Sequence, residues 1–145
     1  MKRKKYIIFY LLFTLLTIAS CKSEIADTIT DETVKDISGT WKVASLTRNG
    51  ESLTQRIDLS KFKVIFKSDG TYTLEDKLAF AVSDPGTYSL NDPQYPYSLI
   101  LTPTGKEAEK ISFQYPIIEG NRQLSLTISP GCTGNVYQYN FVKEN

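Results

Sequence analysis

Acid–base catalysis in this chain would have to use carboxylates, because none of its 145 residues is a histidine. The lack of histidine excludes Ser-His-Asp and Cys-His nucleophilic sites and zinc sites with histidine ligands. Glu107 and Glu109 lie two residues apart and could share one face of a strand, as a glycosidase pair would. Glu75 and Asp76 form a second, adjacent pair. Both pairs lie beside turns and near lysines, where charged side chains are usually solvated, so we predict that the protein is not an enzyme.

The first twenty-one residues have the order of an export signal. Basic residues at positions 2–5 precede an apolar or neutral run at 6–18, as in a secretory signal peptide. As a helix this run would span about 20 Å, less than the roughly 30 Å of a bilayer core. It ends in Ile18-Ala19-Ser20-Cys21, which resembles a bacterial lipobox. The resemblance implies that Cys21 becomes the lipid-modified first residue of the mature chain, and the alternative is an ordinary cleaved signal.

The lipobox resemblance also predicts a location. Diacylglyceryl and N-acyl chains on Cys21 would anchor the protein permanently in a membrane. Lys22 stands where an inner-membrane retention signal has aspartate, and by this resemblance the outer membrane of the cell envelope is favoured. Whether the domain faces the periplasm or the exterior stays open.

We divide the chain into a signal peptide at 1–20, a flexible acidic tether at 21–36 and one domain at 37–145. The tether is short of aromatic residues, so it cannot bury enough apolar surface to offset the entropy of ordering. Without residues 1–20 the chain has 13 basic and 16 acidic residues and no basic run. This charge balance excludes nucleic-acid binding as its function.

The second cysteine, Cys132, lies in the loop-like segment Pro130–Gly134 and has no disulfide partner in the chain if Cys21 is acylated. We therefore expect the domain to fold without an internal disulfide. One free cysteine cannot form a thiolate metal cluster, and no glycine-rich loop between a strand and a helix offers a phosphate site. The sequence predicts no metal and no cofactor.

Apolar and polar residues alternate through most of the domain, which indicates strands with one buried face. The alternating stretches are 41–43, 62–66, 72–74, 78–82, 88–90, 97–101, 111–115, 124–128 and 137–141. Turn residues such as Asn49-Gly50 and Asp84-Pro85-Gly86 separate them. Short connections join antiparallel neighbours.

These strands predict an all-β domain, a single antiparallel up-and-down β-barrel of about eight strands, because closure removes exposed strand edges. An immunoglobulin-like sandwich is the alternative. Its tryptophan lies mid-chain between cysteines, whereas Trp41 is on the first predicted strand. The barrel is favoured.

Four motifs follow one another along the domain: Gly39-Thr40-Trp41, the segment from Phe62 to Thr73, Gly86-Thr87-Tyr88 and the closing segment from Tyr137 to Lys143. In this order they resemble the motifs of lipocalin-like lipoproteins of the Gram-negative outer membrane. The resemblance implies a lipocalin-like barrel. It also implies that a basic residue late in the barrel packs on Trp41, with Lys143 and Arg122 as the candidates.

The aromatic residues suggest two functions. One set would alternate onto the barrel interior and could bind a small apolar or amphipathic molecule: Trp41, Phe66, Tyr72, Tyr88, Tyr115, Tyr137 and Tyr139. If these side chains instead fill the barrel, the protein is an interaction module for an envelope protein or a glycan, such as an inhibitor or an accessory subunit. Tyr95-Pro96-Tyr97 could then supply an exposed contact surface.

Overall fold

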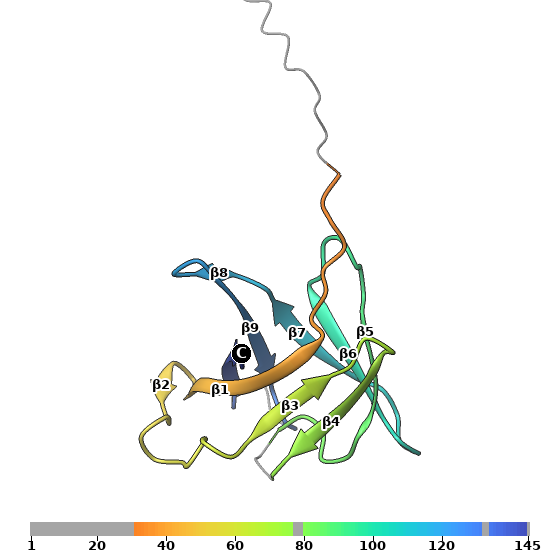
Figure 1. Cartoon of the computed structure of the whole chain (residues 1–145). Coiled ribbons are helices and arrows are strands. Elements are labelled where there is room, and N and C mark those ends of the chain that lie inside the picture. The colour runs from red at the N-terminus through yellow and green to blue at the C-terminus, as the bar shows by residue number, and fades with distance from the viewer. Residues whose placement is uncertain (1–30, 77–79, 132–133, 145) are drawn as a thin grey trace, which may run out of the picture. The chain divides into compact units, whose positions relative to one another are not determined.

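Ten strands make up the regular secondary structure in the computed structural model, which describes residues 31–76, 80–131 and 134–144 (Figure 1). These residues contain no helix, so none was found with the length and apolarity to cross a membrane. The predicted signal peptide, Cys21, Cys132 and most of the predicted tether lie outside the described residues. The strands are β1 (Gly39–Arg48), β2 (Glu51–Ser52), β3 (Lys63–Phe66), β4 (Thr71–Glu75), β5 (Gly86–Leu90), β6 (Ser98–Pro103), β7 (Glu109–Gln114), β8 (Ile117–Ile118), β9 (Asn121–Ile128) and β10 (Tyr137–Lys143).

Eight of the strands form a closed antiparallel barrel in the order β10-β1-β3-β4-β5-β6-β7-β9, with β9 paired again to β10. The short strands β2 and β8 pair with β1 and β9. The other strands each pair with the next barrel strand in sequence, so the connectivity is up-and-down. The pair of β1 with β10 joins the two ends of the domain, with Trp41 opposite Lys143. The predicted all-β barrel of about eight strands is confirmed.

The barrel interior follows from the period-two alternation of the strands. In β7, Ile111 and Phe113 are buried while their neighbours Lys110 and Ser112 are exposed. Buried hydrophobic side chains of seven barrel strands form one cluster, of which Trp41 is the largest member, and the partly buried Tyr88 and Leu90 of β5 pack against it. The outer face is polar, and the inner face is the hydrophobic core.

One of the nine predicted strand stretches, 78–82, is not a strand in its described part, since residues 80–85 contain none. Its described residues Phe80, Ala81 and Val82 nevertheless reach the core. Val82 is buried, and the rings of Phe80 and Phe62 have their centroids 5.5 Å apart. β4 and β5 pair at only two positions, so the connection between them turns its apolar side chains inward instead of extending the ladder. The alternation in this stretch reflects packing of a loop.

Residues 32–38 lead into β1 and contact the barrel. The Lys35 N–H donates a hydrogen bond to the Pro93 carbonyl over 2.7 Å. Ile37 is 2% exposed and belongs to the core cluster. Contact with the barrel is therefore already made at Lys35, inside the segment assigned to the tether from sequence. This segment enters at one end of the barrel, and we call that end the tether end.

Candidate functional site

The seven aromatic residues predicted to line the barrel are all at least partly buried. Trp41, Phe66, Tyr72 and Tyr139 have relative exposures of 0–2%. Tyr88, Tyr115 and Tyr137 are partly buried and pack against the same core cluster. The structure therefore brings all seven residues into or against one core. Whether they can bind a ligand depends on which of their surfaces and polar groups are free.

At the tether end, Trp41 is enclosed on several sides. Its indole Nε1–H donates a hydrogen bond to the Ile37 carbonyl over 2.8 Å. The Tyr115 ring meets it edge-on with centroids 6.2 Å apart, and the Lys143 ammonium lies 5.8 Å from the Trp41 ring centroid. The basic residue expected on Trp41 is thus Lys143. Gly39 has a φ of 130°, and a Cβ there would come within 2.4 Å of the Lys143 side chain, so glycine leaves room for the lysine to cross.

Arg122, the other candidate for Trp41, contacts the neighbouring tyrosine instead. Its guanidinium carbon lies 5.1 Å from the Tyr115 ring centroid, and its Nη1 donates to the Tyr115 carbonyl over 2.9 Å. Because Tyr115 itself packs on Trp41, two cations and two aromatic rings close the tether end together. Cation–π contacts of this kind contribute about 0.5–1 kcal/mol each at exposed sites.

Three tyrosine hydroxyls donate to backbone carbonyls of the protein itself. Tyr72 donates to Asp84, Tyr88 to Lys67 and Tyr115 to Asp36, over 2.9, 2.9 and 3.1 Å. The partners are 12, 21 and 79 residues away in sequence. The Tyr72 bond is partly buried, the Tyr88 and Tyr115 bonds are exposed, and loops and the N-terminal segment supply the three carbonyls. These hydroxyls therefore fasten segments of the chain to the barrel.

A further aromatic group fills the barrel around β10. Tyr139 and Phe141 stack with centroids 6.2 Å apart, and Phe80 meets them edge-on at 5.4 and 6.1 Å. Phe80 comes from the connection between β4 and β5. Phe62, which directly precedes β3, packs on Phe80 and Phe141. Phe62 and Phe80 were not among the predicted interior site residues, although their alternation in the sequence was visible.

Burial changes the acidity of the phenols. It raises the pKa of Tyr72 to about 12, with the nearby Asp84 charge acting in the same direction. Burial also raises the pKa of Tyr139 to about 12. The pKa values of Tyr88 and Tyr115 are raised as well, chiefly by burial. All four phenols are neutral near pH 7 and interact as rings with a hydroxyl donor.

The carboxylates considered for catalysis lie on the surface. Glu107, Glu109, Glu75 and Asp76 are all exposed. Within the described residues no group of three or more metal-ligating side chains comes together. Neither of these two carboxylate pairs lies in an enclosed site.

The aromatic surface predicted around Tyr95 is exposed. Tyr95 and Tyr97 have relative exposures of 59% and 65%, and the Lys110 ammonium lies 5.4 Å from the Tyr97 ring centroid. Ile117 and Ile118 of β8 are exposed by 59% and 45%. The segment that enters at the tether end contacts the first of these regions, where the Lys35 N–H donates to the carbonyl of Pro93, in the loop before Tyr95. The Glu32 carboxylate bonds to Lys35, which lowers its pKa, and the charge of Arg122 adds a smaller effect in the same direction.

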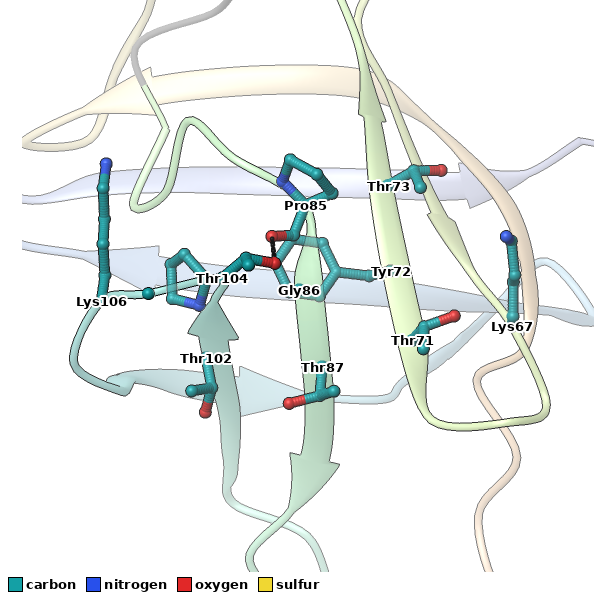
Figure 2. A pocket seen from close by; sticks show the side chains of 12 residues that line it. Lys67, Thr71, Tyr72, Thr73, Pro85, Gly86, Thr87, Thr102, Thr104 and Lys106 are labelled. Atoms are coloured by element: carbon teal, nitrogen blue, oxygen red, sulfur yellow. Dashed lines mark hydrogen bonds between the residues drawn. The ribbon is translucent and has the colours of Figure 1, made fainter.

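A hollow of about 480 Å³ lies on the outer wall of β4, β5 and β6 (Figure 2). Thr71, Thr87 and Thr102 lie directly opposite one another in its wall. They alternate with inward residues such as Tyr72 and Leu101, which are buried, so the threonines face outward. The sequence did not predict this hollow, because its residues come from three short strands and none of these strands contains a recognisable binding motif.

One protein-family model matches the chain. It is described as "Domain of unknown function (DUF5004)" and covers residues 19–142. No match was found among curated proteins or among solved structures.

Proposed function

The chain belongs to the DUF5004 family, and we propose that it is a lipid-anchored protein of the cell envelope that binds a partner through its outer surface, without catalysis. The observation that carries this proposal is the state of the interior aromatic residues. Trp41, Tyr72 and Tyr139 are buried by other side chains, and the hydroxyls of Tyr72, Tyr88 and Tyr115 are bonded to backbone carbonyls. Groups already occupied by the protein are poor ligands for a guest molecule.

The exposed residues at the tether end support a protein partner. Interface centres are enriched in tyrosine and depleted of acidic residues, and hot spots are commonly aromatic. Tyr95 and Tyr97 lie on the loop between β5 and β6. We define these two residues as the aromatic surface. A protein anchored through Cys21 would meet its partner in or near the membrane from which the tether arises.

A photo-crosslinking amino acid placed at Tyr95 or Tyr97 in cells tests the proposal. We expect a discrete crosslinked protein band from these positions. The same amino acid at Ile57, which is 38% exposed and lies in the loop after β2, is the control and should give no such band. Equal crosslinking from all three positions, or none from Tyr95 and Tyr97, would contradict a specific partner surface.

The rival function, binding of a small apolar molecule inside the barrel, has a direct test of its own. Native mass spectrometry of the Cys21→Ser chain, purified from a bacterial periplasm, should give the bare protein mass before and after organic extraction. A stoichiometric adduct that disappears on extraction would overturn the filled-core proposal and would identify the ligand class by mass.

Membrane anchoring is tested by the same substitution. Cys21→Ser removes the thiol to which the predicted diacylglyceryl group attaches, so the protein should move from the membrane fraction to the soluble periplasmic fraction. A Cys132→Ser chain is the matched control and should stay with the membranes. Membrane association of the Cys21→Ser chain would contradict the lipobox interpretation.

A further inference from the structure

The β8–β9 hairpin presents two adjacent isoleucines that the barrel core does not use. Ile117 and Ile118 are 59% and 45% exposed, and neither packs against the core cluster. In the described part of the chain they are the only exposed large aliphatic residues that are neighbours in sequence. Clustered exposed apolar side chains commonly mark an interaction site, whereas single ones need no explanation. We call these two residues the isoleucine pair.

The hairpin holds the isoleucine pair in a fixed geometry. The pair forms strand β8, which pairs with Arg122 and Asn121 of β9. The turn residues Glu119 and Gly120 have φ of 51° and 79°, as a two-residue type I′ turn requires. Successive side chains of a strand point to opposite faces. One isoleucine therefore lies on each face of the hairpin, and both are exposed.

The hairpin lies at the tether end of the barrel. Tyr115, between β7 and β8, donates from its hydroxyl to the Asp36 carbonyl over 3.1 Å, and Arg122 of the hairpin contacts the Tyr115 ring. Figure 1 shows β8 outside the barrel wall, beyond the end of β7. Cys21 precedes Lys35 by fourteen residues, and fourteen residues span at most about 50 Å. A lipid on Cys21 would therefore keep the hairpin within reach of the bilayer surface.

A bilayer surface fits this hairpin better than a protein surface does. A protein partner or a second copy docked on one face would leave the other isoleucine in water, whereas the headgroup region of a bilayer surrounds a projecting hairpin on both faces. The free edge of β8 is only two residues long, so it offers few backbone bonds to an added strand. Glu119 and Arg122 carry opposite charges, so the attraction would be apolar and not electrostatic.

We propose that the isoleucine pair enters the headgroup region of the bilayer in which the protein is anchored, and so holds the barrel with its tether end against the membrane. This inference rests on the proposed lipid anchor at Cys21. Two isoleucines alone give a weak contact with lipid. The anchor makes that contact intramolecular and raises its effective concentration. Docking in this way would limit the orientations in which the aromatic surface meets a partner.

Quenching of a fluorophore by spin-labelled lipid tests the proposal. The full chain is purified from membranes with Cys132→Ser and Asn121→Cys, labelled with a nitrobenzoxadiazole dye at position 121, and placed in phosphatidylcholine vesicles that contain nitroxide-labelled lipid. Position 121 lies opposite Ile118, so both isoleucines are retained. A second chain is labelled through Ser52→Cys, an exposed position paired to the far end of β1. We expect at least three-fold stronger quenching at position 121, and equal quenching would overturn the proposal.

Matched variants separate the isoleucine pair from other exposed apolar residues. Ile117→Ser with Ile118→Ser should reduce quenching at position 121 to the level of position 52. Ile57→Ser with Val136→Ser removes two aliphatic side chains that are 38% and 36% exposed and lie outside the hairpin, and quenching should stay unchanged. Retained quenching without the isoleucine pair, or equal loss in both double variants, would refute a specific contact of the hairpin.

Flotation of the same vesicles separates this proposal from the anchor on which it rests. A chain that floats without quenching at position 121 would refute docking of the hairpin and leave the anchor standing, whereas a chain that does not float would refute both. Quenching should persist in molar salt, and its loss there would show an electrostatic contact and contradict the apolar one. A dye in an apolar environment that nitroxide lipid does not quench would place protein, such as a second copy, over the hairpin and would overturn the proposal.

Discussion

Replacement of Trp41 by alanine measures how much of the barrel's stability depends on the closure of its tether end. Trp41 has 0% exposure, and truncation of a buried tryptophan to alanine costs about 3–5 kcal/mol. The loss includes the Nε1–H bond to the Ile37 carbonyl and the contacts with Tyr115 and Lys143. Domains have a total stability of about 5–15 kcal/mol. Trp41→Ala should therefore remove a large part of the free energy of unfolding.

Urea unfolding followed by far-ultraviolet circular dichroism is the suitable assay, because Trp41 is the chain's only tryptophan and its fluorescence disappears with the substitution. The urea midpoint should fall while the slope stays constant. Trp41→Phe keeps an aromatic ring and loses the indole donor, so its loss should be smaller than that of Trp41→Ala. Tyr97→Ala, at a position that is 65% exposed, is the control and should cost less than about 1 kcal/mol. A loss below about 1 kcal/mol for Trp41→Ala would refute the view that this residue closes a packed barrel.

Two more predictions follow from the close approach of strands and from buried phenols. Gly86→Ala should destabilise the protein by about 1–3 kcal/mol, because the added carbon meets backbone atoms of β6; Gly134→Ala, with open space around it, should be neutral, and equal melting temperatures would contradict the argument. The pKa values of Tyr72 and Tyr139 are about 12 in the folded state against 10.0 for a free phenol, so above pH 10 the unfolded chain binds fewer protons than the folded one and stability should fall from about pH 10 through about pH 12. Phenolate absorbance and urea midpoints measured over this range check the prediction, and titration of every tyrosine near pH 10 in the folded protein would disprove it.

The strands of the barrel could be predicted because each is specified locally. Eight of the nine alternating stretches became the eight barrel strands, as in β7, where Ile111 and Phe113 point inward between polar neighbours. Asn49 and Gly50 both have positive φ in the turn between β1 and β2, as an Asn-Gly turn requires. The strand predicted at 78–82 was wrong in its described part, because an alternating pattern indicates which side chains are buried and does not indicate whether the backbone pairs with another strand.

The candidate sites were less predictable. The sequence placed seven aromatic residues on the inner face, but it could not show that Tyr72, Tyr88 and Tyr115 donate to carbonyls up to 79 residues away. It named Lys143 and Arg122 as the two candidates for Trp41. The pairing of β1 with β10 then placed Lys143 opposite Trp41, and the β8–β9 hairpin directed Arg122 to Tyr115.

By itself, the sequence determined the all-β class and the eight barrel strands, because period-two burial and turn chemistry act over a few neighbouring residues. It also contains the segment at residues 1–21 that resembles an export signal, and the proposed anchoring at Cys21 rests on that resemblance. The tertiary structure alone decided which interior groups are already bonded, and it placed Thr71, Thr87 and Thr102 opposite one another on three neighbouring strands. Those properties depend on contacts between residues far apart in the chain, and such contacts are set only when the barrel closes.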